Sequence, residues 1–371
     1  MKCSNCRVDN NLKDREANRG RCKNCRQLFA FEPTAMKAPF KFTDIFFAQL
    51  IEDVSANDTL FFTEAQLYYL INRRLERKII QQSGPLTTLA FVGTVIGGIM
   101  LLNAAIGWGM VLIAISIVLA LWDKRQKRKQ LLKQPKTFPV NWATFNDWHQ
   151  QWQRAKGDTQ RQLAPVRQQV NQVAISPQVS DYSFDRVVVC EHDDIAQMLI
   201  ANNLHFEHNC VVVSINGYPA EIFDTVMTML KRNPNLSVYA LHDASPSGLR
   251  VPTMLRQSQW FPDTSINIYD LGLLPRHAVM LKNPFVIASD AAKQQARQLP
   301  DEILSHLSQD EHQWLMAGNI LALAAFGPKR ILQVISQGIG RVRLANTATS
   351  GDDAYWHDSD DSLILFSDGF G

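Results

Sequence analysis

The chain has 371 residues, a length that accommodates two or three globular domains, and a formal net charge of +3. The charge is unevenly placed, because basic residues gather near the amino end and around a long apolar run, whereas the carboxyl end is acidic. Four of the six cysteines lie within the first 25 residues, which suits a metal site in a reducing compartment better than the disulfide framework of a small secreted protein. The first apolar run of sufficient length begins beyond residue 80, so we expect no secretory signal.

Two Cys-x-x-Cys pairs, Cys3 with Cys6 and Cys22 with Cys25, are separated by fifteen residues. This spacing is typical of four-thiolate sites, so residues 1–30 are expected to form a zinc ribbon that holds structural Zn2+. Four cysteine ligands leave no position for a catalytic water.

The ribbon is also basic, and two interpretations stay open. One is contact with nucleic acid, DNA or RNA; the other is a solvated face, or a patch resting on anionic lipid head groups. The basic residues are Lys2, Arg7, Lys13, Arg15, Arg19, Arg21, Lys23 and Arg26.

Residues 31–84 are predicted to form cytoplasmic helices, with apolar side chains at helical spacing in stretches 46–54 and 61–79. Thr63 is expected to cap the second helix. Tyr68 and Tyr69 in that helix are more typical of packing or interfacial anchors than of a nucleophile.

A run without any ionisable side chain extends from Leu86 to Trp122. One membrane crossing needs about 20 apolar residues, so the run is long enough for two. Asn103 offers a polar turn near its middle, and we expect residues 85–123 to form a transmembrane helical hairpin in the lipid bilayer. A buried helical pair in a soluble core and one long tilted helix fit less well, because soluble helices keep a polar face and a single helix would overshoot the bilayer.

Basic residues flank this run on both sides, which places both flanks, and hence both termini, on the cytoplasmic side of the cell membrane. They are Arg73, Arg74, Arg77 and Lys78 before it, and Lys124, Arg125, Lys127, Arg128 and Lys129 after it. Residues 124–183, rich in Lys, Arg and Gln, are expected to form a helical stalk and linker.

From residue 184 the pattern changes to short apolar strands that alternate with amphipathic helices. It predicts an α/β domain over residues 184–345 with a mainly parallel sheet buried on both faces, followed by a solvated acidic tail, residues 346–371. The expected strands lie within residues 187–190, 210–217, 237–243, 266–272 and 279–283.

Ligands of parallel sheets bind at the carboxyl ends of strands, and three features are expected there: Glu191, Gly217 and Asp243. Carboxylates brought together at this edge would form an oxygen-rich site suited to magnesium, Mg2+. Glu191 has an equal alternative, because a carboxylate there can cap the following helix. His192 and His242 are expected to be loop or surface histidines rather than ligands.

In this order, Glu191, the Gly217 turn and the segment from Asp243 to Gly248 resemble the Toprim domain, most closely the version found in the topoisomerase VI A-subunit. The resemblance covers residues 184–340, under half of the chain. It implies that Glu191 and Asp243 are catalytic metal ligands, and that Gly217, Pro246 and Gly248 contribute to ligand binding. It also implies DNA strand chemistry at a magnesium site.

Two features depart from the family. The second acid of its Asp-x-Asp motif is Ser245 here, and Asp193, Asp194 and Asp270 are candidate substitutes. The tyrosine nucleophile of the family comes from a winged-helix domain, whereas residues 131–181 contain no tyrosine and are too short for one. We therefore expect a domain that binds nucleic acid or another phosphate-containing ligand, and two interpretations stay open: a metal-dependent nuclease or phosphodiesterase, or a fold that binds after loss of catalysis. The alternatives are an inactive scaffold or sensor, and recruitment of a protein partner to the membrane.

Overall fold

The computed structural model describes residues 1–37, 40–82, 135–166, 185–230, 236–257, 266–281 and 284–348. Two compact units divide the chain: one consists of residues 1–71 and 140–371, and the other of residues 72–139. In the smaller unit, Lys136 Nζ lies 3.0 Å from Glu76 Oε2.

The predicted hairpin, residues 85–123, lies outside the described residues, as do most of the predicted linker and the acidic tail from residue 349 onward. Within the described ranges, no helix has both the length and the apolar character that a membrane crossing requires.

The amino-terminal segment consists of two similar turns that flank helix α1 (Leu12–Ala17). Each turn is closed by a main-chain hydrogen bond, from Arg7 N to Cys3 O and from Arg26 N to Cys22 O, both 3.0 Å long. Arg7 and Arg26 both have positive φ values, 62° and 60°, so the two Cys-x-x-Cys pairs adopt the same backbone conformation.

Both helices predicted before the apolar run are confirmed, as α2 (Asp44–Val54) and α3 (Glu64–Gln82). Thr63 caps α3 as predicted: Gln66 N donates to Thr63 Oγ1 at 3.2 Å, and Thr63 N donates to Gln66 Oε1 at 2.9 Å.

Helix α6 (Trp142–Lys156) falls in the segment predicted to form a stalk, and it packs against α2. The rings of Phe47 and Trp152 lie 5.1 Å apart, and Lys156 Nζ lies 3.0 Å from the buried carboxylate of Asp44. Lys156 also donates to Leu28 O at 2.8 Å, so α6 is joined to the segment that follows the cysteines.

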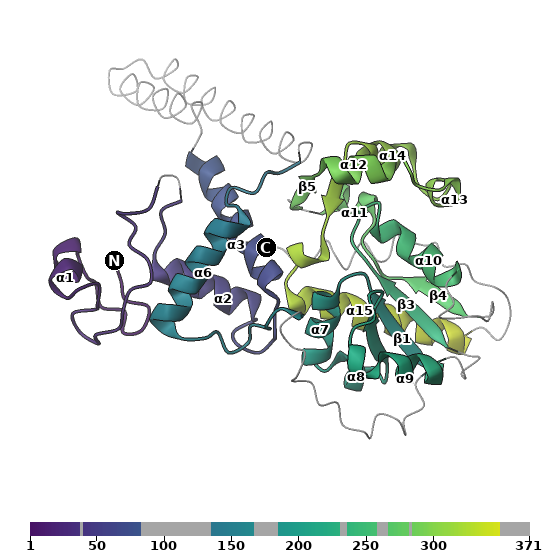
Figure 1. Ribbon diagram of the computed structural model, residues 1–371, viewed down its shortest axis with the longest axis horizontal. Coiled ribbons are helices and arrows are strands. Elements are labelled where there is room, and N and C mark those ends of the chain that lie inside the picture. The colour runs from purple at the N-terminus through teal and green to yellow at the C-terminus, as the bar shows by residue number, and fades with distance from the viewer. Residues whose placement is uncertain are drawn as a thin grey trace, which may run out of the picture. The chain divides into compact units, whose positions relative to one another are not determined.

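A four-stranded parallel sheet forms the centre of the carboxyl-terminal part, with strand order β2-β1-β3-β4. Strands β1, β3 and β4 are labelled in Figure 1. The mainly parallel α/β domain is thus confirmed. The strands are β1 (Arg186–Cys190), β2 (Val211–Ser214), β3 (Ser237–Leu241) and β4 (Asn267–Asp270).

Both faces of the sheet are covered, as the continuous apolar strands predict. On one face, Val188, Tyr239 and Leu241 belong to a core shared with α7 (Asp193–Ala201), α8 (Leu204–Glu207) and α15 (Pro328–Ala348). On the other face, Val187, Val189 and Val238 pack with α9 (Ala220–Leu230) and α10 (Val251–Gln257).

The strand expected within residues 279–283 is wrong, because Val279 and Met280 end helix α11 (Pro275–Met280). Pro275 stands in the first turn of this helix, where its fixed φ angle favours helix initiation.

A smaller subdomain follows, with the antiparallel strands β5 (Val286–Ala288) and β6 (Asn319–Leu321). Its helices are α12 (Asp290–Ala296), α13 (Asp301–Leu304) and α14 (Gln309–Met316), and the 3-10 turns η3 (Gly248–Arg250) and η4 (Leu323–Ala325) border it. The main chains of Ala244 and Leu321 exchange two hydrogen bonds of 3.0 Å. This bridge holds the loop after β3 against the end of β6.

Candidate functional site

The four predicted zinc ligands lie together at the amino end. Cys3 Sγ is 3.6 Å from Cys25 Sγ, Cys6 Sγ is 3.6 Å from Cys22 Sγ, and all four sulfurs lie within 4.8 Å of one another. Sulfurs about 2.3 Å from a tetrahedral zinc ion are separated by roughly 3.8 Å. The cluster therefore fits one such ion.

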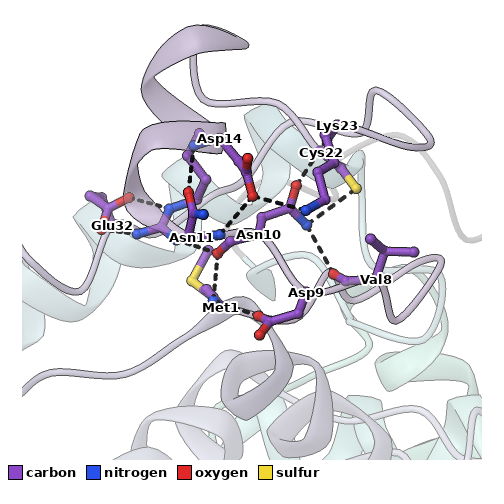
Figure 2. Close-up of polar contacts among 10 residues, drawn as sticks. Met1, Val8, Asp9, Asn10, Asn11, Asp14, Cys22, Lys23 and Glu32 are labelled. Carbon is purple, nitrogen blue, oxygen red and sulfur yellow. Dashed lines mark hydrogen bonds and ion pairs between the residues drawn. The ribbon is translucent and has the colours of Figure 1, made fainter.

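Asn10, which the sequence analysis did not single out, joins the two cysteine turns (Figure 2). Its fully buried amide donates to Val8 O at 2.9 Å and to Cys22 Sγ at 3.5 Å, and its oxygen accepts from Lys23 N at 2.9 Å. Burial disfavours the Cys22 thiolate, but the N–H groups of Cys25, Asn24 and Asn10 outweigh it and lower the pKa of this thiol to about 6.

Arg15 does not belong to the basic face of the ribbon, because its side chain is buried. Its guanidinium donates to both carboxylate oxygens of Glu32, at 2.8 and 2.9 Å. These hydrogen bonds lower the pKa of Glu32 to about 2.

Glu191 and Asp243 follow the adjacent strands β1 and β3, and the structure brings them together. Both are buried. Glu191 Oε2 accepts from the main-chain N–H of Asp243 at 2.9 Å, and Oε1 accepts from Ser247 Oγ at 2.9 Å. The carboxylate is thus held by the loop after β3 rather than by α7, whose N-cap position is His192.

His192 completes a group of three ligand atoms that lie within 4.8 Å of one another. Its Nε2 is 3.0 Å from Asp243 Oδ2 and 3.8 Å from Glu191 Oε2. The other Asp243 oxygen, Oδ1, accepts from Leu323 N at 2.7 Å. The side chain of His192 is 44% exposed, whereas both carboxylates are nearly inaccessible, so the group opens to solvent on the histidine side.

The carboxylates change the protonation of His192. Burial alone would lower its pKa, but the hydrogen bond to Asp243 and the charges of Asp243 and Glu191 raise it to about 9. Without a metal ion, the imidazole therefore carries a proton at neutral pH and balances part of the negative charge.

Ser245, at the position of the family's second acid, is buried in the turn after β3. Its Oγ accepts from Gly248 N at 2.9 Å and lies 3.0 Å from Ser247 Oγ. A Cβ at Gly248 would lie 2.1 Å from Asp243 O and 2.8 Å from Glu191 Oε2, so the turn requires glycine there. Pro246 lies in the same turn, and its predicted ligand-binding role stays a prediction.

None of the three candidate substitutes for the missing acid joins this group of ligand atoms in the described part of the chain. Asp193 accepts from Ser214 Oγ at 2.6 Å, and Asp194 from Ile195 N at 2.9 Å. Asp270 lies against His242, with Oδ1 2.9 Å from Nε2 of the ring. Gly217 has φ 84° and forms the turn after β2, as its backbone role predicts.

His242 lies in the loop after β3, as one of its two expected positions predicts, but its side chain is completely buried rather than at the surface. Gly272 packs against the ring, and Leu273 N donates to the main-chain oxygen of His242 at 2.8 Å. A Cβ on Gly272 would lie 2.4 Å from this imidazole.

Tyr68 and Tyr69 both pack as predicted. The Tyr68 hydroxyl donates to Val140 O at 2.9 Å, and the Tyr69 ring lies edge-on to Phe285 at 5.7 Å. Burial, together with the charge of Asp243, raises the pKa of Tyr69 above its usual range. The Tyr69 phenol therefore stays protonated and lies within electrostatic reach of Asp243.

Residues 186–263 match the Toprim domain of the topoisomerase 6 A-subunit/Spo11 family. The matched segment contains Glu191, Asp243 and the turn that ends at Gly248. No curated protein and no solved structure matches the chain. The resemblance is confirmed for this segment, which matches a Toprim domain close to the topoisomerase VI A type.

Proposed function

We propose that the Toprim domain of this chain binds nucleic acid through a divalent cation held by Glu191 and Asp243, and cleaves phosphodiester bonds there. One observation carries the proposal: two buried carboxylates from adjacent strand ends converge with an exposed imidazole in a segment that matches a Toprim family. Clustered ionisable groups with a perturbed pKa are typical of functional sites.

The ligand atoms that Glu191 and Asp243 supply indicate which cation fits the site. Magnesium takes one or two carboxylates together with water and substrate phosphate, and Glu191 and Asp243 supply that minimum. Hydrogen bonds from Ser247 to Glu191 and from Leu323 to Asp243 hold the carboxylates in place without closing every lone pair. When bound, a divalent cation would neutralise phosphate charge and polarise the phosphoryl group.

Ser245 favours a second function, that of a catalytically inactive scaffold or sensor. Its hydroxyl holds the turn through Gly248 and lies against Ser247, so it does not replace the missing carboxylate. Such a protein would bind nucleic acid, another phosphate-containing ligand or a protein partner without turnover.

The proposal places this domain at the cytoplasmic face of the cell membrane, as a multi-pass protein. Its support is the uncharged run from Leu86 to Trp122 and the basic residues on both sides of that run. The amino-terminal ribbon would be stabilised by a structural zinc ion on its four cysteines, with its basic residues facing nucleic acid or anionic lipid.

The test uses the full chain in detergent micelles and measures Mg²⁺- and Mn²⁺-dependent cleavage of single- and double-stranded DNA and RNA. Glu191→Gln and Asp243→Asn should each abolish cleavage, because each removes a charged ligand while keeping the side-chain shape. Glu207→Gln, a change at an exposed position of α8, should leave cleavage intact. Nucleic-acid binding without any cleavage by the folded wild-type protein would favour the scaffold function instead.

A further inference from the structure

We propose that His192 is the third protein ligand of this centre, in place of the family's second acid, and that the site therefore takes a first-row transition-metal ion such as Mn²⁺ in preference to Mg²⁺. This inference rests on the proposed function, because it needs Glu191 and Asp243 to hold a cation.

The spacing of the three ligand atoms supports a shared ion. Atoms about 2.1 Å from one ion are separated by roughly 3.0 Å at adjacent octahedral positions and by roughly 3.4 Å in a tetrahedron. His192 Nε2 lies 3.0 Å from Asp243 Oδ2 and 3.8 Å from Glu191 Oε2. The separation of Nε2 and Oδ2 already fits an octahedral ion, Glu191 Oε2 would have to approach Nε2 by about 0.4 to 0.8 Å, and all three atoms lie within 4.8 Å of one another.

The other oxygen donors nearby have structural partners. Ser245 Oγ accepts from the main chain of Gly248, Asp193 binds Ser214 at 2.6 Å, and Asp270 lies against the buried ring of His242. Recruiting any of these side chains would break a hydrogen bond that maintains the turn or the sheet edge. His192 faces both carboxylates already and needs no such rearrangement.

The position of His192 also suits a ligand on the open side of the site. It is the N-cap residue of α7, so its main chain is fixed directly after Glu191, and its side chain is 44% exposed. The two carboxylates lie on the buried side of the group. Water or a substrate phosphate would therefore approach the ion from the side of the imidazole.

The nitrogen donor determines the class of metal. Mg²⁺ prefers oxygen ligands and loses its water reluctantly, whereas imidazole suits transition metals. Replacing a carboxylate by His192 removes one negative charge and adds a nitrogen. Both changes weaken Mg²⁺ binding relative to the binding of an ion that accepts imidazole.

The test measures binding of Mn²⁺, and of Mg²⁺ in competition with it, to the zinc-loaded full chain in detergent micelles by electron paramagnetic resonance. Mn²⁺ is the probe because thiolates of the ribbon favour softer metals. Bound Mn²⁺ should show spin-echo modulation from a coordinated nitrogen. His192→Ala should remove that modulation and weaken Mn²⁺ binding at least about tenfold, with a smaller effect on Mg²⁺.

Two further variants keep the result interpretable. His192→Asp restores a carboxylate, so it should bind an ion without nitrogen modulation and shift the preference toward Mg²⁺. His312→Ala, on α14 and outside the group of ligand atoms, should behave as the wild type.

Mn²⁺ binding without nitrogen modulation, unchanged in His192→Ala but lost in Glu191→Gln, would overturn the inference and leave the proposed function standing. Absence of any bound ion in the wild type would overturn both. Binding that appears only in His192→Ala would also overturn both, since the imidazole would then occupy the place of the ion.

Discussion

His242 directly precedes Asp243 of the candidate site, and its Nε2 lies 2.9 Å from Oδ1 of Asp270. The other ring nitrogen, Nδ1, lies 2.9 Å from the main-chain oxygen of Asp243. Both partners are hydrogen-bond acceptors, so the ring donates from both nitrogens and is an imidazolium. Burial would lower its pKa, but the Asp270 carboxylate raises it to about 9. The pair of His242 and Asp270 thus fixes the main chain of Asp243, a proposed metal ligand.

Asp270→Asn should destabilise the α/β domain, because it leaves the buried imidazolium without its counter-charge. The Asp270 side chain is 37% exposed, so we expect the free energy of unfolding to fall by only about 2 kcal/mol. The measurement is thermal unfolding of the full chain followed by near-ultraviolet circular dichroism. Asp310→Asn, at an exposed position of α14, is the control, and an equal unfolding midpoint for both variants would contradict the role assigned to Asp270.

Gly248→Ala should distort the turn that carries the carboxylates, because the added methyl group would lie 2.1 Å from Asp243 O. We expect Mn²⁺ affinity to fall at least about tenfold, as when groups that orient metal ligands are lost. Gly340→Ala is the matched control, since its methyl group would meet no atom within 4 Å and alanine favours a helix. Wild-type ion binding by Gly248→Ala would show that the turn tolerates a side chain.

Asn10→Ala should weaken zinc binding by the ribbon by about 10 to 100-fold, because the amide donates to a ligand sulfur and fixes the second cysteine turn. Zinc retention against a competing chelator measures the effect. Asn11→Ala removes the cap of α1, where Asn11 contacts Asp14 rather than a cysteine, and should retain zinc more firmly than Asn10→Ala.

The buried, neutral imidazole of His277 leads us to expect that the α/β domain loses stability in acid. Leu274 N donates to Nδ1 of the ring at 3.0 Å, so the folded state needs the neutral imidazole. Burial, with the charge of Arg276, lowers its pKa from 6.5 to about 4. Between these values the unfolded state binds more protons, so stability falls as the pH decreases through this window, by on the order of 3 kcal/mol in total.

The measurement is the urea midpoint of the α/β domain within the full chain, at pH 7 and at pH 4.5. His277→Gln keeps an acceptor for Leu274 but cannot take up a proton, so it should lose less stability than the wild type on acidification. His312→Gln is the control and should retain the wild-type dependence. Parallel behaviour of His277→Gln and the wild type would rule out His277 as the source.

Several features followed from local sequence alone. The spacing of Cys3, Cys6, Cys22 and Cys25 sufficed to predict a four-sulfur cluster, because each Cys-x-x-Cys pair closes its own short turn. Glu191 and Asp243 could be predicted to meet, because each comes just after a strand and the carboxyl ends of parallel strands lie at one edge of a sheet.

Only the tertiary structure decided what surrounds those carboxylates. Leu323 N reaches Asp243 from 80 residues away, through the bridge between Ala244 and Leu321, and no periodicity encodes that pairing. The orientations of His192 toward the site and of His242 into the core depend on side-chain contacts with Asp243 and Asp270. Motif spacing therefore determined which residues the sheet brings to its edge, whereas long-range packing determined how each one is bonded there.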